Sequence, residues 1–468
     1  INVDFVAVRD DNIFGGYDHD GGSHVYTGTK TCTDAPNQCA DNGYTSHACV
    51  DKANANEGVE CKPCSPYMDG GGDGAVVKWA KAFTCGDKPS PRAYTSAVVW
   101  NHSIVVFGGY SLSSATMVSE IWSFSFRNLS WASISTTEAP SGRSEMIAVV
   151  NDSNLVVSSG NSPVPNGQTG DNHKDVWKLN LNSLRWEDIS PSSGTPETRA
   201  YAMVKYNTSM YLFGGYPFSD KTLKFDLVSL SWKDLELSHN PGARYGMSGI
   251  LYGNEMFTFG GKKSSSWHND VWKLGLLSLP YQWSDVTTFG TKPAARCEHA
   301  AVLYRSQMIV FGGTSNSGRY NDVWSLNLWT MTWVEVSPPG PKPEARRGVS
   351  AVLYGHKMFI FGGEDYASDP SYYGDLWTLD LGALCHIPPS GDVGISNDCT
   401  MLDQVTVTGD LTVTGKENVY SKVTAASTKR HFHIASGTPT LTIRWLNLTD
   451  GAPGMTQKGG SIYIEGEK

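Results

Sequence analysis

The sequence has 468 residues and a formal net charge of −9, and these bulk properties exclude several classes of protein. Charged residues make up only 18% of it, whereas glycine (49), tyrosine (21) and tryptophan (15) are plentiful, which is typical of many short strands joined by tight turns. The sequence has no long run of Lys or Arg and no apolar stretch of ~20 residues. We therefore expect neither a nucleic-acid partner nor a membrane span.

The first predicted region is a cysteine-rich N-terminal segment, residues 1–74, which is polar and lacks the apolar residues to fold alone. Six cysteines lie in it or just after it, and we expect them to form disulfides: Cys32, Cys39, Cys49, Cys61, Cys64 and Cys85. The sequence does not choose among their pairings. A zinc site is the alternative, but only Cys61 and Cys64 have a ligand-like spacing and no second pair follows them.

Two acidic, glycine-rich pieces of the same segment, residues 18–22 and 69–74, are candidates for a Ca²⁺ site. Closely spaced carboxylates in a flexible loop suit that ion. Solvated turns are the simpler interpretation, because neither piece has the full ligand spacing of a calcium loop. We expect no other metal and no organic cofactor.

Two features place the protein outside the cytosol, in the extracellular space or at the cell surface. The clustered cysteines suit an oxidising compartment. The second feature is a set of five sequons for N-glycosylation, at Asn101, Asn128, Asn151, Asn207 and Asn447. The sequence starts at Ile1 without a charged and apolar leader, so we interpret it as a mature form whose signal peptide has been removed.

The central part of the sequence is an internal repeat, each copy of which is expected to form four short strands. A Phe-Gly-Gly element recurs after an arginine and an apolar run, at residues 107–109, 213–215, 259–261, 311–313 and 361–363, with a worn copy at 158–160. A strand with a first tryptophan follows, at Trp122, Trp177, Trp272, Trp324 and Trp377, with Phe225 in its place in the third copy. A second tryptophan closes the unit, at Trp131, Trp186, Trp232, Trp283 and Trp333.

This order of arginine, glycine pair and two tryptophans resembles the Kelch repeat, whose unit is one four-stranded blade of a β-propeller. The resemblance covers roughly residues 75–385. It implies an all-β fold, and we assign residues 75–390 to a six-bladed propeller. The double glycine lets the chain turn where a side chain would clash, and the indoles fill the wedge between blades.

The sixth copy lacks its closing tryptophan, and the missing residue stands upstream. Trp79 precedes Arg92 by thirteen residues, and the other closing tryptophans precede the next arginine by twelve or thirteen. We therefore expect the strand around Trp79 to be the outermost strand of the last blade, closing the ring and removing an exposed edge. Residues 12–17 imitate the Phe-Gly-Gly element, so a remnant of a seventh blade is the alternative.

The repeated arginines are the candidate binding residues. If the copies superimpose, they form a ring at one mouth of the propeller and could recognise a carboxylate or sulfate: Arg92, Arg143, Arg199, Arg244, Arg296 and Arg346. The alternative is that each arginine holds its own blade's loop through backbone carbonyls. The variable loops after the glycine pairs, residues 163–173, 262–268 and 364–373, are the better candidates for a recognition surface.

No catalytic site is expected. Kelch propellers include galactose-oxidase-like enzymes, whose copper site needs two histidines and two tyrosines, one of them linked to a cysteine. Within the propeller region, Cys297 is the only cysteine with a nearby histidine, His299. His431 and His433 lack a third ligand. No nucleophile elbow, phosphate loop or His-Glu-x-x-His pair occurs. Intracellular ubiquitin-ligase adaptors, another Kelch class, are disfavoured by the absence of a BTB-like helical region.

The C-terminal region, residues 391–468, alternates Val and Thr, as in residues 405–415. Period-two segments that end in glycine resemble the first turns of a parallel β-helix, and a small β-sandwich is the alternative. Cys385 and Cys399 are close enough to bridge a loop, which leaves Cys297 free and buried.

These observations predict an extracellular structural or adhesion scaffold rather than an enzyme. The propeller presents loops to other extracellular proteins or glycans, and the C-terminal region joins it to a larger assembly. An uncapped β-helix end at residues 461–468 favours stacking of subunits into a cell-surface filament, such as a flagellar hair (mastigoneme).

Overall fold

In this computed structural model every regular element of the described residues is a strand. The described part comprises residues 77–384, without 83, 112, 115, 162–171, 193, 366–370 and 383, together with the backbone of strands before and after it. No helix in this part is long and apolar enough to cross a membrane. The all-β class expected from the sequence is therefore confirmed.

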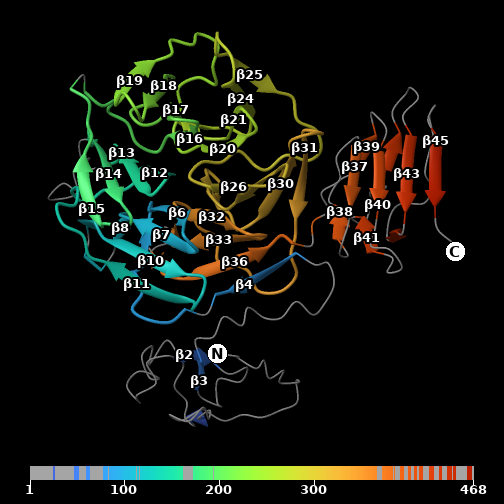
Figure 1. Ribbon diagram of the computed structural model, residues 1–468, viewed down its shortest axis with the longest axis horizontal. Coiled ribbons are helices and arrows are strands. Elements are labelled where there is room, and N and C mark those ends of the chain that lie inside the picture. The colour runs from blue at the N-terminus through green and yellow to red at the C-terminus, as the bar shows by residue number, and fades with distance from the viewer. Residues whose placement is uncertain are drawn as a thin grey trace. The chain divides into compact units, whose positions relative to one another are not determined.

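The centre of the chain forms antiparallel four-stranded sheets, numbered here in chain order (Figure 1). Sheets 1 to 3 are β6 (Ser96–Trp100), β7 (Ser103–Phe107), β10 (Ile121–Ser125), β11 (Ser130–Ile134); β12 (Ile147–Asn151), β13 (Asn154–Ser158), β14 (Val176–Asn180), β15 (Arg185–Asp188); and β16 (Ala202–Tyr206), β17 (Ser209–Phe213), β18 (Thr222–Asp226), β19 (Ser231–Asp234).

Sheets 4 to 6 follow the same order from the inside outwards, except that the last strand of sheet 6 comes from the start of the propeller sequence. They are β20 (Ser248–Tyr252), β21 (Glu255–Phe259), β24 (Val271–Gly275), β25 (Trp283–Val286); β26 (Ala300–Tyr304), β27 (Gln307–Phe311), β30 (Val323–Asn327), β31 (Thr332–Val336); and β32 (Ser350–Tyr354), β33 (Lys357–Phe361), β36 (Leu376–Asp380), β4 (Lys78–Lys81).

The innermost strands close a ring around an axis, as Figure 1 shows. Strands β6, β12, β16, β20, β26 and β32 contact one another in this order, and β32 contacts β6 in turn. The closing strand is β4, whose Trp79 lies opposite Leu379 of β36. The predicted role of the strand around Trp79 is thus confirmed. It follows that the two ends of the repeat region are joined in one sheet.

The core lies between neighbouring sheets, and aromatic pairs mark it. Strand β17 is buried along its whole length, because sheets cover it on both faces. The closing tryptophan of one sheet packs on the phenylalanine that precedes the glycine pair of the sheet before it. Ring centroids are 5.4 Å apart for Trp186 and Phe107, and 4.9 Å apart for both Trp283 with Phe213 and Trp333 with Phe259.

The third copy of the repeat differs from the sequence assignment. Leu212 of β17 pairs with Leu223, just as Val157 of the second copy pairs with Trp177. Leu223 therefore occupies the first tryptophan position. The assignment of Phe225 to that position was wrong, because Phe225 is two residues further along the strand.

Shorter strands connect or flank the sheets. Those inside the propeller region are β5 (Arg92–Ala93), β8 (Tyr110–Ser111), β9 (Thr116–Met117), β22 (Lys262–Lys263), β23 (Ser266–Trp267), β28 (Thr314–Ser315), β29 (Gly318–Arg319), β34 (Glu364–Asp365) and β35 (Ser371–Tyr372). Near the N-terminus, β1 (Val25–Tyr26), β2 (His47–Asp51) and β3 (Val59–Pro63) form a separate sheet. In it, Cys49 lies opposite Cys61.

The C-terminal strands pair in parallel. They are β37 (Gly391–Gly394), β38 (Cys399–Met401), β39 (Val405–Val407), β40 (Leu411–Thr414), β41 (Ser421–Ala425), β42 (Phe432–Ile434), β43 (Thr440–Arg444), β44 (Leu446–Thr449) and β45 (Ser461–Glu465). Most of these strands pair with the strand three places further along the chain, as β37 with β40 and β38 with β41, whereas β43 pairs with β45. The described strands of this region therefore form parallel sheets, and the parallel β-helix that the alternating Val and Thr segments resemble stays a prediction.

Several sequence expectations fall outside the described residues. The acidic pieces 18–22 and 69–74, the Phe-Gly-Gly imitation at 12–17, and the cysteines Cys32, Cys39, Cys64 and Cys385 are among them. Of the other cysteines, Cys85 is disulfide-bonded. Cys297 is free and buried, as predicted.

Candidate functional site

The repeated arginines are structural clamps inside their own sheets. Each of five is at least nine-tenths buried, and one of its guanidinium nitrogens lies 2.6 Å from a carboxylate oxygen: Arg92 with Glu120, Arg143 with Asp175, Arg244 with Asp270, Arg296 with Asp322 and Arg346 with Asp375. The carboxylate also accepts a hydrogen bond from the first tryptophan, as from Nε1 of Trp177 to Asp175 at 2.8 Å.

These five guanidinium groups find their hydrogen-bond and charge partners within the fold. Each also donates to the carbonyl oxygen that closes its sheet's glycine turn, as Arg296 does to Gly312 at 2.9 Å. The ring of ligand-binding arginines expected at the mouth does not match this geometry. The alternative interpretation, in which each arginine holds its own loop, describes these five residues.

Arg199 lies one residue out of register with the other five. Thr198 takes the clamp position and donates to the carbonyl of Gly214 at 3.2 Å. The third sheet has Lys221 and Leu223 where other sheets have a carboxylate and a tryptophan, so a guanidinium there would find no partner. Arg199 instead lies near the axis, with its Nε 3.1 Å from Glu145 and its guanidinium 4.7 Å from the centre of the Tyr216 ring.

Six equivalent residues form a ring around the axis at the end where the glycine turns lie: Tyr94, Glu145, Ala200, Gly246, Glu298 and Gly348. Each backbone N–H donates to the carbonyl of the previous member, and the N–H of Tyr94 donates to Gly348, over distances of 2.6 to 3.1 Å. All six have left-handed backbones, with φ from 53° to 69°. The ring fixes six side-chain positions that no strand occupies.

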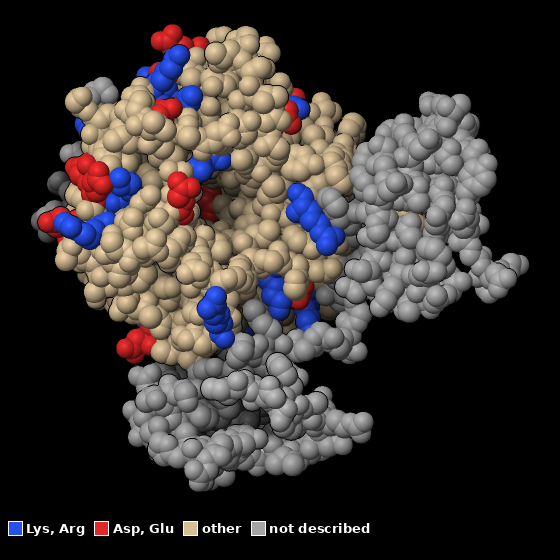
Figure 2. All heavy atoms as spheres, viewed as in Figure 1, with Lys and Arg blue, Asp and Glu red and all other residues tan. Residues whose placement is uncertain are grey.

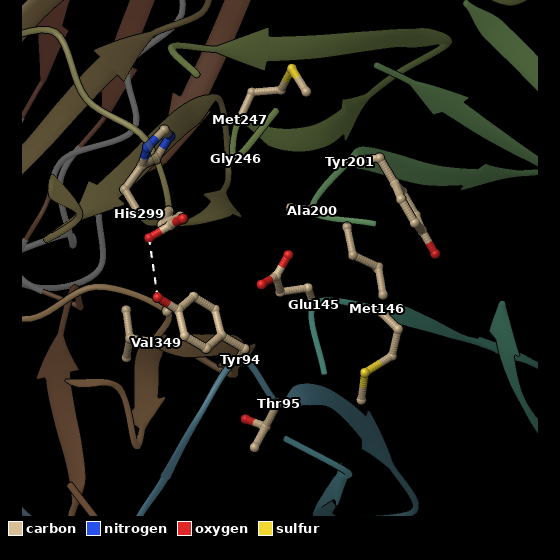
Figure 3. A pocket seen from close by; sticks show the side chains of 13 residues that line it. Tyr94, Thr95, Glu145, Met146, Ala200, Tyr201, Gly246, Met247, His299 and Val349 are labelled. Carbon is tan, nitrogen blue, oxygen red and sulfur yellow. Dashed lines mark hydrogen bonds between the residues drawn. The ribbon is translucent and has the colours of Figure 1, made fainter. Parts of the chain in front are cut away.

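A cavity of about 120 Å³ lies on the axis within this ring. Its walls include Tyr94, Tyr201, Glu145, Glu298 and His299. In Figure 3 the carboxyl group of Glu145 points into the space between the labelled side chains. The space-filling view in Figure 2 shows the centre of the ring as a hollow with charged atoms at its edge.

One side of the cavity is a closed network of charges. Tyr94 donates from its hydroxyl to Glu364 at 2.8 Å and to Glu298 at 3.3 Å. The guanidinium of Arg347 lies 2.6 Å from Glu364 and 3.1 Å from Glu298. Burial and the two carboxylates raise the pKa of the Tyr94 phenol well above its usual value, so the phenol stays a donor. This network ties sheets 1, 5 and 6 together.

The other side is less completely paired. Within the described residues the carboxylate of Glu145 pairs with Arg199. Burial raises the pKa of Glu145 to about 7, against the opposing effect of Arg199. Burial also lowers the pKa of His299 to about 3, so this wall of the cavity carries no cationic imidazole near neutral pH.

Aromatic side chains continue the site from Arg199 to the rim. Tyr216, Phe218 and Tyr245, called here the aromatic trio, meet with ring centroids 5.7 to 5.8 Å apart. Tyr216 is 36% exposed and Phe218 is 44% exposed. Beyond them the ammonium of Lys262 lies 4.4 Å from the centre of the Trp267 ring. Tyr216 and Phe218 follow the glycine pair of sheet 3, this hairpin follows the glycine pair of sheet 4, and Tyr245 follows the clamp residue Arg244.

Of the three loops expected to carry recognition, residues 262–268 belong to this rim, while 163–173 and 364–373 are described only in part. The axial ring was missed from the sequence, because its six members share a position after the clamp but no residue type. The sequence signal that could have revealed the ring is the presence of a glutamate at two of these six equivalent positions. Among the described residues no group of three His, Cys, Asp or Glu side chains is placed to hold a metal.

The fold and this site define a Kelch-type β-propeller with a polar axial cavity. The profile of the KLHDC2/KLHL20/DRC7 Kelch-repeats domain matches residues 73–215, 167–303 and 200–391. The chain therefore belongs to the Kelch-repeat family.

Curated relatives show partial matches. The alpha chain of the flagellar outer arm dynein of Chlamydomonas reinhardtii is 32% identical over 270 residues, which cover 54% of this chain and 5% of that protein. Kelch domain-containing protein 10 of Mus musculus is 27% identical over 280 residues, which cover 54% of this chain and 63% of that protein. The chain thus spans less than two thirds of either relative. The structure of YjhT superimposes with a TM-score of 0.49 and 14% identity, covering 62% of this chain and 95% of that one.

Proposed function

We propose that this chain is a protein-recognition scaffold, which receives its partner on the propeller face that carries the glycine turns. The aromatic trio, whose Tyr216 and Phe218 are exposed, is the observation that supports this most strongly. Aromatic side chains supply much of the binding energy at protein interfaces, because they bury a large area with few rotatable bonds. The clamp arginines hold the scaffold rigid behind this face.

The experiment that tests this function compares two exposed apolar residues of sheet 3. Phe218 belongs to the trio, whereas Val228, 76% exposed, lies in the turn between β18 and β19 at the opposite end of the strands. Partner protein purified with the chain from its native source should bind Phe218→Ser at least ~10-fold more weakly, and Val228→Ser as tightly as the unchanged chain. Equal loss in both variants, or in neither, would place the interface elsewhere.

We further propose that the scaffold works outside the cell, where its partner is an extracellular protein or, as the alternative, a glycan. Asn101 and Asn207 lie in the turns between the first and second strands of sheets 1 and 3, Asn151 is the last residue of β12 before the equivalent turn of sheet 2, and Asn128 lies in the turn between β10 and β11. In antiparallel sheets these turns are at the end away from the glycine turns. Glycans there would leave the recognition face bare.

Mass spectrometry of native material decides the location. Glycans on most of the four asparagines, and oxidised N-terminal cysteines, are the expected result. Unmodified asparagines together with reduced cysteines would contradict the extracellular assignment.

The filament role is a proposal of the same kind. The parallel pairing of the C-terminal strands supports it, since parallel sheets of this kind extend by adding further strands of the same direction. Head-to-tail addition does not close on itself and yields filaments, as in a flagellar hair. Sedimentation of native full-length protein should show concentration-dependent assembly, and a monomer at high concentration would rule the role out.

A further inference from the structure

The axial cavity has a chemical character of its own, distinct from that of the aromatic rim. Two carboxyl groups, Glu145 and Glu298, are in its walls, and no lysine or arginine is among the residues that line it. The hydroxyl of Tyr94 is directed to carboxylates. The side chains of this space therefore present mainly acceptors of hydrogen bonds.

The two carboxyl groups differ in how many hydrogen-bond and charge partners they have. Glu298 accepts from Tyr94 and pairs with Arg347, which also pairs with Glu364. Glu145 has a single contact with Arg199, through Nε, while the Nη1 of that arginine donates to Asn161 and Asn172. The side chain of Glu145 is 23% exposed although it lies on the axis. Its carboxylate therefore has acceptor capacity that is open to the cavity.

The size of the cavity limits what can enter. A volume of about 120 Å³ is far below the ~300 Å³ of a typical small-molecule site. It suits one slender side chain. The lysine side chain is an unbranched stem with a compact ammonium that donates three hydrogen bonds, whereas the guanidinium of arginine is broad and planar.

We propose that the cavity is the pocket for a lysine side chain of the partner protein, whose ammonium binds the carboxylate of Glu145 while the surrounding chain lies on the aromatic trio. This inference rests on the proposed function, and it adds the chemistry of the anchor residue. Charge complementarity selects the occupant: a partly buried carboxylate with open acceptors favours a cation and repels an acidic side chain. Lys262 is held over Trp267 at the rim and does not line the cavity.

The binding is pH-dependent in a defined direction. The charged groups that act on Glu145 are Arg199, Glu298, Arg347 and Glu364, and with burial they bring its pKa to about 7. The ammonium needs the ionised carboxylate, so affinity rises as the pH increases through 7. The affinity of a neutral probe should not change over the same pH range.

The test measures the affinity of the full chain for two capped tripeptides by calorimetry. Acetyl-Gly-Lys-Gly-amide and acetyl-Gly-norleucine-Gly-amide share the same stem and differ in the ammonium. At pH 8 the lysine peptide should bind at least ~10-fold more tightly, and at pH 6 the preference should shrink. Glu145→Gln should abolish the preference, Glu145→Asp should restore part of it, and the exposed control Glu187→Gln should leave it intact.

Equal affinity of both peptides for the unchanged chain, or a lysine preference that survives in Glu145→Gln, would overturn the lysine pocket. The recognition function itself is judged separately by Phe218→Ser and the native partner. If partner binding depends on Phe218 and the peptides are not discriminated, the proposed function stands and the pocket assignment fails. If the chain prefers the lysine peptide but binds the partner equally well with Phe218→Ser, the pocket assignment stands and the proposed interface is wrong.

Discussion

The indole of Trp79 packs edge to face on the phenyl ring of Phe311, with centroids 5.1 Å apart. Trp79 comes from the first strand of the propeller sequence, and Phe311 from the fifth sheet. The closing strand β4 is thereby held by hydrogen bonds within sheet 6 and by an aromatic contact with sheet 5. Ring closure thus depends on a side chain as well as on a ladder of backbone hydrogen bonds.

Replacing Trp79 with alanine should destabilise the propeller strongly. The side chain is 5% exposed, and truncation of a buried tryptophan costs about 3–5 kcal/mol of unfolding free energy. Chemical denaturation followed by tryptophan fluorescence measures the change in midpoint. Lys81→Ala, on an exposed position of the same strand, is the matched control and should be nearly neutral. Similar shifts in both variants would mean that β4 contributes only its backbone.

Removing the carboxylate from a clamp should be costly too. Asp322→Asn leaves the fully buried Arg296 guanidinium without a counter-charge, which costs about 3–5 kcal/mol. Glu187→Gln breaks the exposed pair with Lys178, and the expected change is below ~1 kcal/mol. Thermal unfolding of both variants provides the comparison, and a neutral Asp322→Asn would show that the clamp is dispensable.

The same clamp predicts an acid-sensitive stability. Burial raises the pKa of Asp322, but its hydrogen bond and charge interaction with Arg296 outweigh burial, so the pKa lies below its ordinary value. The unchanged chain should therefore be more stable than Asp322→Asn at pH values above the ordinary aspartate pKa of about 3.9. This difference disappears as the pH falls through the lower folded value. A difference that persists unchanged at pH 2 would contradict this assignment.

The sequence predicted the scaffold well because its signals are local. Trp79, the glycine pairs and the clamp arginines recur at fixed spacing, and such spacing survives in a single sequence. The register error at Arg199 arose because the arginine stands next to the true clamp position, Thr198. The missing carboxylate at Lys221 was the signal that should have corrected it.

The candidate site was less predictable, because it is made of positions rather than residue types. Tyr94, Glu145 and Gly348 look unrelated in sequence, and only their common left-handed backbone and the ring of hydrogen bonds bring them together. Contacts between neighbouring sheets, such as that of Tyr94 with Glu364, join residues from different copies of the repeat. No periodicity within one copy encodes them.

Alanine substitutions at two glycines with the same backbone φ distinguish the cost of backbone strain from the cost of a steric clash. Gly348 and Gly355 both have φ of +61°, and a Cβ at Gly348 would lie 2.7 Å from Cε1 of Tyr94, whereas nothing lies within 4 Å of one at Gly355. Gly355→Ala should cost about 1 kcal/mol from backbone strain alone. Gly348→Ala should cost ~1–3 kcal/mol more, because it displaces the Tyr94 ring. Equal costs in denaturation experiments would show that Tyr94 moves freely.

Glu145→Gln should change how the stability of the propeller depends on pH. Burial is the largest cause that raises the pKa of Glu145 to about 7, so the folded chain binds the proton more tightly than the unfolded chain does. The stability linked to this proton is fully present below the unfolded value of about 4.3 and is lost as the pH rises through 7. Relative to Glu145→Gln, the unchanged chain should therefore lose stability between these limits, by on the order of 4 kcal/mol, and level off at higher pH. Melting temperatures of both proteins from pH 4 to 9 give this difference, with exposed Glu138→Gln as the control whose curve should follow that of the unchanged chain. A constant difference between the unchanged chain and Glu145→Gln across the whole range would mean that the carboxyl group has the same pKa in the folded and unfolded states.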